Sequence, residues 1–210
     1  MDLLTDWLSR QTPLEVAGVI TGILCVWLAA KNIIWNWPVA IISVSIYIVI
    51  FLDAKLYADM GLQVYFLAMN IYGWIYWSRM KRAAAARPGE ARPKPVSRIK
   101  MSEWMYSGIA VTVFTAVIGF LLHRNTDAAF PFVDSFCTAI SLVAQVFLAR
   151  RVMENWLMWI FVDVIYVVVY LLKDLHLTAA MYALYVYIAA MGYFDWKKDY
   201  RKQLVYEQNG

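Results

Sequence analysis

Charge is scarce in this chain: only 16% of its 210 residues are charged, whereas 62% are hydrophobic. Soluble domains carry about 25% charged residues. Cysteine and histidine are scarcer still, with two of each, and both Cys25 and Cys137 lie deep within apolar runs. These shortages argue against a disulfide framework or a metal site, and we expect no cofactor. The composition indicates a polytopic membrane protein.

Apolar stretches long enough to cross a bilayer recur along the chain. A spanning helix needs roughly 20 mainly apolar residues, with about 17 as the lower limit. The N-terminal stretch 1–13 is acidic and has no long apolar core, so we expect no cleavable signal peptide. We expect an all-α membrane protein with seven transmembrane helices. These helices are predicted at residues 14–35, 38–54, 60–78, 102–122, 133–150, 156–173 and 177–195.

One segment is clearly polar. Residues 78–100 are basic and rich in proline and alanine, which predicts a flexible cytoplasmic linker. With this linker inside, 15 Lys and Arg residues lie inside and four lie outside. Because basic residues accumulate on the cytoplasmic side, we expect the N-terminus outside and the C-terminus inside.

The sequence contains an internal repeat. Shifted by 119 residues, residues 36–77 align with residues 155–196 without a gap, and ten of 42 positions are identical. Apolar composition alone explains the aliphatic matches but not the others. The others pair Asn36 with Asn155, Trp37 with Trp156, Tyr47 with Tyr166, Gly73 with Gly192, and Trp77 with Trp196.

Each repeat holds three predicted helices, and three crossings leave the chain on the opposite side of the membrane. The extra helix at 102–122 therefore lets both repeats take the same orientation, which predicts a 3+1+3 arrangement of parallel repeats. Such pseudo-symmetry is typical of transporters, with the solute site between the repeats near the midplane. We divide the chain into a first repeat (1–79), a basic linker (80–100), a linking helix (101–123), a second repeat (130–198) and a cytoplasmic tail (199–210).

Three motifs carry a resemblance to a known family. They are QxxxxxxNIYGWxxW at residues 63–77, ENWxxWxxxD at residues 154–163, and GYxxWKK at residues 192–198. Together they resemble the PnuC family of bacterial vitamin transporters, whose main class carries nicotinamide riboside. The resemblance extends from about residue 14 to residue 198.

This resemblance implies a SWEET-like 3+1+3 fold and a homotrimer in the bacterial inner membrane. It also implies facilitated diffusion without a coupling ion, with the solute trapped inside by a cytoplasmic kinase. Related members are believed to carry thiamine or flavins. The resemblance therefore does not fix which vitamin is transported. Nicotinamide riboside is the first candidate and thiamine the second.

Asp163 is the most unusual residue for a solute site, because it lies inside an apolar segment. A carboxylate in hydrocarbon costs about 2.5–3.5 kcal/mol on insertion scales, so we expect Asp163 to face the protein interior. It either joins helices through a hydrogen bond or salt bridge, or it binds a cationic solute. Trp156, Trp159 and Tyr166 share its helix face by their spacing. Indole rings attract cations, although the tryptophans also suit a membrane interface or a packing stripe.

Four amides are further candidates for solute contact. Gln63 and Asn70 lie seven residues apart on one predicted helix, Gln145 lies within another, and Asn155 lies at a helix end. Buried amides either hold helices together or bind a carboxamide or ribose, and the sequence leaves both roles open.

Two other classes of protein fit less well. A retinal protein needs a lysine in its last helix, and residues 177–195 contain none. A seven-helix receptor does not explain the repeat. The sequence contains none of the enzyme motifs HExxH and GxSxG, and no pair of catalytic carboxylates. We therefore expect that the protein is not an enzyme.

Overall fold

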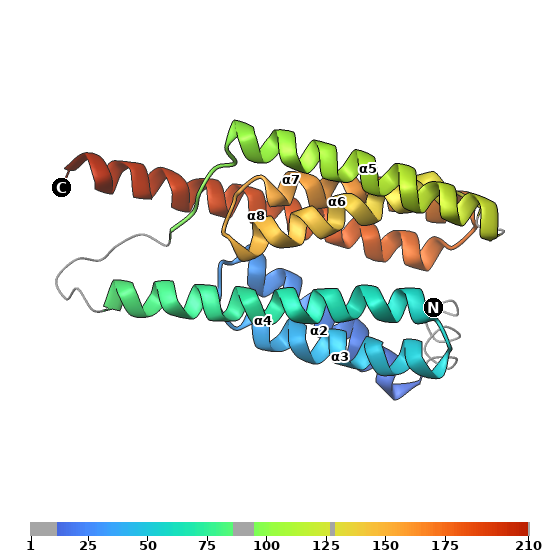
Figure 1. The fold of residues 1–210 in the computed structure, drawn as a ribbon. Helices are drawn as coiled ribbons and strands as arrows, with labels where there is room; N and C mark the ends of the chain where they lie inside the picture. The colour runs from blue at the N-terminus through green and yellow to red at the C-terminus, as the bar shows by residue number, and fades with distance from the viewer. Residues whose placement is uncertain (1–11, 86–94, 127–128, 210) are drawn as a thin grey trace. The chain divides into compact units, whose positions relative to one another are not determined.

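The computed structural model describes residues 12–85, 95–126 and 129–209. This part of the chain is all-helical apart from one isolated β-bridge. Its seven α-helices are α2 (Pro13–Ala30), α3 (Asn36–Asp53), α4 (Tyr57–Ala85), α5 (Met101–Asn125), α6 (Pro131–Ala149), α7 (Asn155–Leu172) and α8 (His176–Asn209) (Figure 1). The predicted all-α class is confirmed.

Six of the seven described helices are long and apolar enough to cross a membrane. The exception is α4, whose apolar character is lowered by Gln63, Asn70 and the basic residues of its last turns. Large apolar side chains remain exposed along α5 at a spacing of three or four residues, including Ile109, Val113 and Val117. A helix with such an exposed apolar face suits lipid better than water.

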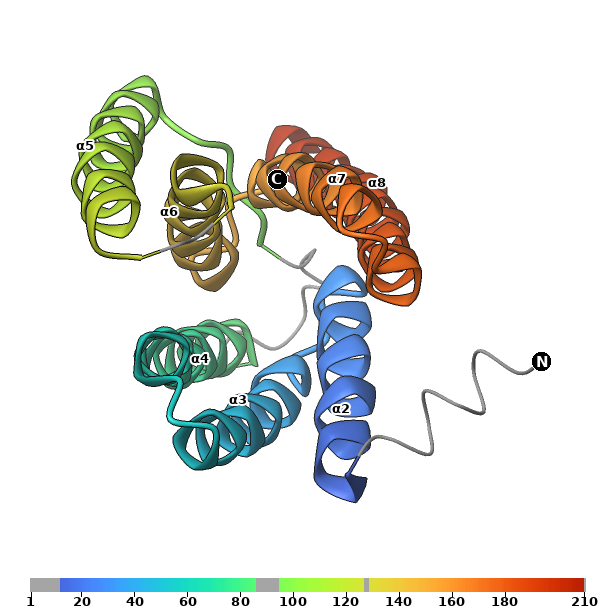
Figure 2. The ribbon, with the colours of Figure 1, turned by 90° about the vertical axis from the view of Figure 1, so that its right-hand side faces the viewer.

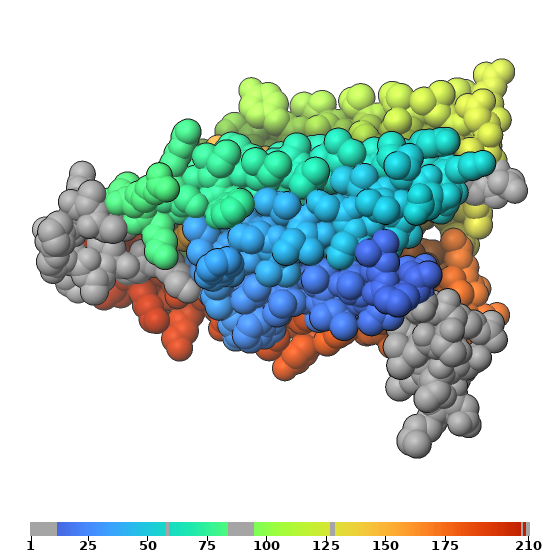
Figure 3. All heavy atoms as spheres, turned by 90° about the horizontal axis from the view of Figure 1, so that it is seen from below, coloured from blue at the N-terminus to red at the C-terminus, as the bar shows by residue number. Residues whose placement is uncertain are grey.

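The first unit comprises residues up to Glu90. In it, α3 packs against both α2 and α4 (Figure 2). Side chains of these three helices meet along their length on the face shown in Figure 3. The Ser43 hydroxyl of α3 donates to the Gly18 carbonyl of α2 at 3.2 Å. Trp37 of α3 covers Gly73 of α4 so closely that a Cβ there would collide with its ring.

The second unit comprises residues from Ala91 onward. Here α6 lies between α5 and α7, and α7 also packs against α8 (Figure 2). The α7–α8 pair is held by the same kind of contact as the α3–α4 pair. Trp156 of α7 covers Gly192 of α8, where an added Cβ would lie 2.8 Å from the indole.

The turns also agree between the two units at the offset of 119 residues. Asn32 and Arg151, which end the turn after α2 and α6, have φ values of 53° and 59°. Lys55 and Asp174, which follow α3 and α7, have φ values of 57° and 56°. Left-handed backbone is uncommon for residues other than glycine, so its recurrence at matched positions reflects one shared turn geometry.

Two elements differ from the sequence predictions. The last helix was expected to end near residue 195, but α8 continues to Asn209, because no glycine or proline interrupts residues 193–209. The linker was expected to be flexible from residue 78. Its first residues extend α4 to Ala85, because they include an alanine run with high helix propensity. Its last residues, 95–100, are ordered within the second unit and contact the turn between α6 and α7, as described below.

Candidate functional site

Asp163 is buried in the second unit, with 6% of its surface exposed. It lies on α7 away from the exposed apolar face of that helix, as expected from the cost of placing a carboxylate in lipid. The exposed residues that define this apolar face are Leu157, Phe161, Val164, Val168 and Leu171.

The surroundings of Asp163 come from three helices. The carboxylate is within electrostatic range of the Cys137 thiol on α6 and of the Tyr182 hydroxyl on α8. Among the residues that the structure describes, none donates a hydrogen bond to Asp163 or forms an ion pair with it. A buried acid without a partner is costly, and a bound cation is one way to offset that cost.

A group of tyrosines begins one helical turn beyond Asp163. The ring centroids of Tyr166 on α7 and Tyr182 on α8 lie 5.1 Å apart. Tyr170 stacks on Tyr182 at 5.2 Å with an interplanar angle of 24°. Of the three, only Tyr166 was predicted as a site residue from the sequence, although Tyr170 follows it at a spacing of four residues on the same helix. Of these tyrosines, Tyr182 lies within electrostatic range of the carboxylate, and the hydroxyls of Tyr166 and Tyr182 hydrogen-bond to Thr138 and Tyr170.

The two tryptophans of α7 have different environments. Trp156 is 1% exposed, and its ring lies edge-on to Trp196 of α8 at 5.6 Å. These contacts give Trp156 a packing role within the unit. Trp159 is only half-buried and makes no ring contact with another aromatic residue in the described part of the chain. Of the two, Trp159 therefore keeps more of its ring surface available for a solute.

Asn155 also has a structural role. Its Nδ2 donates to the Val152 carbonyl at 2.6 Å, as Asn36 does to Ile33 at 2.7 Å in the first unit. The Asn155 Oδ1 atom is buried and accepts no hydrogen bond within the described residues. The Nδ2 atom of Asn155 thus stabilises the turn before α7, whereas its Oδ1 atom has no donor within the described residues.

The remaining predicted residues are divided between the two units. Gln145 is buried on α6 of the second unit. Asn70 is buried and Gln63 is half-buried on α4 of the first unit. The second unit therefore brings Gln145, Asn155, Trp156, Trp159, Asp163 and Tyr166 onto the neighbouring helices α6 and α7.

Comparison with known proteins gives consistent matches. A family model described as nicotinamide mononucleotide transporter matches residues 12–198. The nicotinamide riboside transporter PnuC of Escherichia coli (strain K12) is 30% identical over 211 residues, covering 90% of this chain and 87% of the relative. The riboflavin/roseoflavin transporter RibM of Streptomyces davaonensis is 24% identical, covering 87% of this chain and 83% of the relative.

A solved structure agrees with these matches. The crystal structure of the vitamin B3 transporter PnuC superposes with a TM-score of 0.71 at 25% identity, covering 96% of this chain and 87% of that one. The resemblance carried by the three sequence motifs is thereby confirmed. The chain is a multi-span membrane protein that belongs to the PnuC family of bacterial transporters, and not an enzyme.

Proposed function

We propose that this chain carries nicotinamide riboside across the bacterial inner membrane. The observation that supports this most directly is Asp163, a buried carboxylate that has no cation or hydrogen-bond donor among the described residues. Nicotinamide riboside has a flat pyridinium cation and a polar ribose. In a site of low dielectric constant, a carboxylate attracts such a cation much more strongly than it does in water.

The aromatic side chains suit the same solute. An indole or phenol face attracts a cation by about 0.5–2 kcal/mol, and Trp159 and Tyr166 lie within a turn of Asp163. Asn155 and Gln145, on neighbouring helices of the second unit, carry amide groups of the kind that bind a carboxamide or a ribose, and Gln63 and Asn70 of the first unit stay candidates from the sequence. Trp156 would act mainly by holding α7 against α8.

The charge of Asp163 also favours the riboside over the mononucleotide that the family description names. A phosphate monoester adds about −1.5 to −2 charges near neutral pH. We expect repulsion between this phosphate and Asp163. Titration calorimetry on purified protein should give clearly weaker binding of the mononucleotide than of the riboside. Equal affinities would contradict the proposal.

We further propose the 3+1+3, SWEET-like arrangement of seven transmembrane helices, with α4 as the third crossing. It is supported by the turns and tryptophan–glycine contacts that recur at an offset of 119 residues. In this arrangement α5 is the linking helix, the N-terminus is outside and the C-terminus is inside. Labelling of single cysteines at Lys55 and Lys202 in intact cells tests this topology. Only the cysteine at position 55 should react with an impermeant reagent.

The mode of transport follows from the resemblance. We propose that a homotrimer moves the riboside by facilitated diffusion and that a cytoplasmic kinase traps it by phosphorylation. In proteoliposomes, the riboside should equilibrate without any ion gradient, and enclosed kinase with ATP should convert equilibration into accumulation. Accumulation driven by an ion gradient alone would contradict this mode.

Thiamine is the second candidate solute, because it is also a flat organic cation. The relative RibM carries the name of a riboflavin transporter, so flavins belong in the comparison. Riboflavin is uncharged and gains nothing from a buried carboxylate. A binding panel of nicotinamide riboside, nicotinamide, thiamine and riboflavin therefore separates these alternatives.

A further inference from the structure

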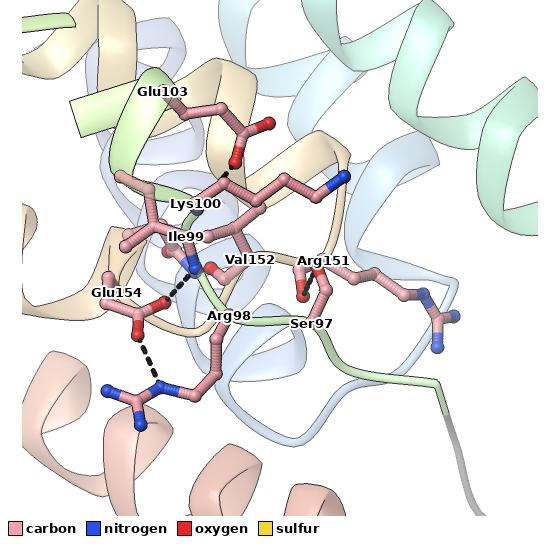
Figure 4. Close-up of polar contacts among 9 residues, drawn as sticks. Ser97, Arg98, Ile99, Lys100, Glu103, Arg151, Val152 and Glu154 are labelled. Carbon is pink, nitrogen blue, oxygen red and sulfur yellow. Dashed lines mark hydrogen bonds and ion pairs between the residues drawn. The ribbon is translucent and has the colours of Figure 1, made fainter. Parts of the chain in front are cut away.

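Residues 95–100 form an ordered segment, here called the strap, that runs beside the turn between α6 and α7 (Figure 4). Ser97 pairs with Val152 in a parallel β-bridge. The Ser97 N–H donates to the Arg151 carbonyl at 2.9 Å, and the Met153 N–H donates to the Ser97 carbonyl at 2.9 Å. These bonds satisfy backbone groups on both segments and fix the register between them.

Glu154 holds the next part of the strap. Its carboxylate accepts from the Ile99 N–H at 3.0 Å and from the Arg98 Nε at 3.1 Å (Figure 4). The Glu154 residue is only 5% exposed, whereas the Arg98 side chain is largely exposed. Hydrogen bonds to an ionised acceptor are stronger than neutral ones. Glu154 belongs to the ENWxxWxxxD motif, but the proposed solute site gives it no role.

The strap is also tied to a third element. The Val96 N–H donates to the Gln203 Oε1 of α8 at 3.0 Å. Arg151 Nη1 donates to the Pro95 carbonyl at 3.3 Å. The strap thus joins the α6–α7 turn to the C-terminal part of α8.

The first unit shows that this turn does not need a glutamate. Residues 32–35 form the corresponding turn, with the same left-handed residue at Asn32 and the same bond from the next asparagine side chain to a carbonyl. The position that matches Glu154 is Trp35, which is 66% exposed. A turn of this geometry therefore forms without the carboxylate, and the distinct task of Glu154 is to bind the strap.

We propose that Glu154 is a positioning residue for the solute site and acts through the strap. Glu154 directly precedes Asn155, where α7 begins, so its bonds to the strap fix the start of that helix. Asp163 lies eight residues further along, about 12 Å at 1.5 Å per residue. A rotation or shift at the start of α7 would therefore displace both the Asn155 acceptor and the Asp163 carboxylate. This inference rests on the proposed function.

The first test is Glu154→Gln, which preserves size but replaces the charged acceptor with an amide. We expect binding of nicotinamide riboside by folded protein to weaken about tenfold, within the usual range for coupled sites. The matched control is Glu15→Gln. Glu15 also accepts a backbone hydrogen bond, from the Thr12 N–H at 2.6 Å, but it lies on α2 of the first unit and belongs neither to the strap nor to the α6–α7 turn. Its variant should bind like the wild type.

The second test restores the strap by a covalent bond. Ser97→Cys and Val152→Cys are introduced into the Glu154→Gln variant. Paired strands lie about 4.8 Å apart, within the Cα separation that a disulfide spans. Oxidation should bring the affinity to within about twofold of the wild type, and reduction should weaken it again. The same cysteine pair with Glu154 intact should show no redox dependence.

The outcomes separate this inference from the proposed function. Failure of the wild type to bind nicotinamide riboside would contradict the proposed function. Wild-type affinity in Glu154→Gln, or weak affinity that oxidation does not restore, would overturn the positioning role. If Glu154→Gln does not fold, Arg98→Ala removes one of the two bonds and should weaken binding by a smaller factor. Unchanged affinity in that variant would also overturn the inference.

Discussion

Trp156 lies edge-on to Trp196, with 5.6 Å between the ring centroids, and its ring covers Gly192. The first unit contains the same contact between Trp37 and Trp77 at 5.2 Å. The two helices of each pair approach closely because a glycine leaves room for an indole. This contact joins the helix that carries Asp163 to its neighbour, so it links stability to the proposed site.

Trp156→Ala should strongly destabilise the protein. Loss of a fully buried indole leaves a cavity and costs about 3–5 kcal/mol. Thermal unfolding of detergent-purified protein should show a large drop in Tm. Trp35→Ala is the matched control, because that ring is mostly exposed, and its Tm should stay close to the wild-type value.

Gly192→Ala should also lower the Tm. The new Cβ would lie 2.8 Å from the Trp156 ring, and overpacking of this kind typically costs about 1–3 kcal/mol. Gly61→Ala offers a control within another helix, because nothing lies within 4 Å of a Cβ at that position. There alanine should be neutral or stabilising through its helix propensity. Equal effects at both glycines would contradict the packing argument.

Asp163→Asn should weaken the binding of cations selectively. The amide keeps the size of the side chain but removes its charge, so we expect nicotinamide riboside to lose at least about tenfold in affinity, or 1.4 kcal/mol. Neutral nicotinamide should lose much less. Asp53→Asn, at an exposed helix end, is the control. Calorimetry of the wild type and both variants with each of the two ligands measures the difference, and an equal loss for both ligands in Asp163→Asn would exclude a role for the charge.

Trp159→Ala should lose most solute binding while the protein still folds and assembles. The ring is half-buried and has no aromatic contact in the described part of the chain, so its removal costs less stability than removal of Trp156. Trp159→Phe should recover part of the affinity, because a smaller aromatic face still attracts a cation. Wild-type affinity in the alanine variant would remove the stacking role.

Much of the architecture could be predicted from the sequence, because apolar runs and matched residues are local signals. The cost of a carboxylate in lipid correctly predicted that Asp163 is buried. The difference between Trp156 and Trp159 could not be predicted, since tryptophans at an interface, in a core and in a solute site share one residue pattern. Tertiary contacts decide among them.

The strap shows a second limit. Its pairing joins Ser97 to Val152 across 55 positions and involves backbone groups, which leave no periodic pattern in the side chains. The basic and proline-rich composition of residues 78–100 instead predicted flexibility. Nothing in the sequence identified Arg98 and Ile99 as partners of Glu154.

The length of α8 has a mechanical consequence. Its 34 residues extend about 51 Å, whereas the hydrocarbon core is about 30 Å thick. About 20 Å of helix therefore extends beyond the acyl chains, and Gln203 lies on this C-terminal part. A spin label on Lys202 would therefore be attached to a rigid helix and not to a flexible tail. If α8 tilts during a transport cycle, the label would move further than the part of the helix inside the membrane, by a displacement that can be measured.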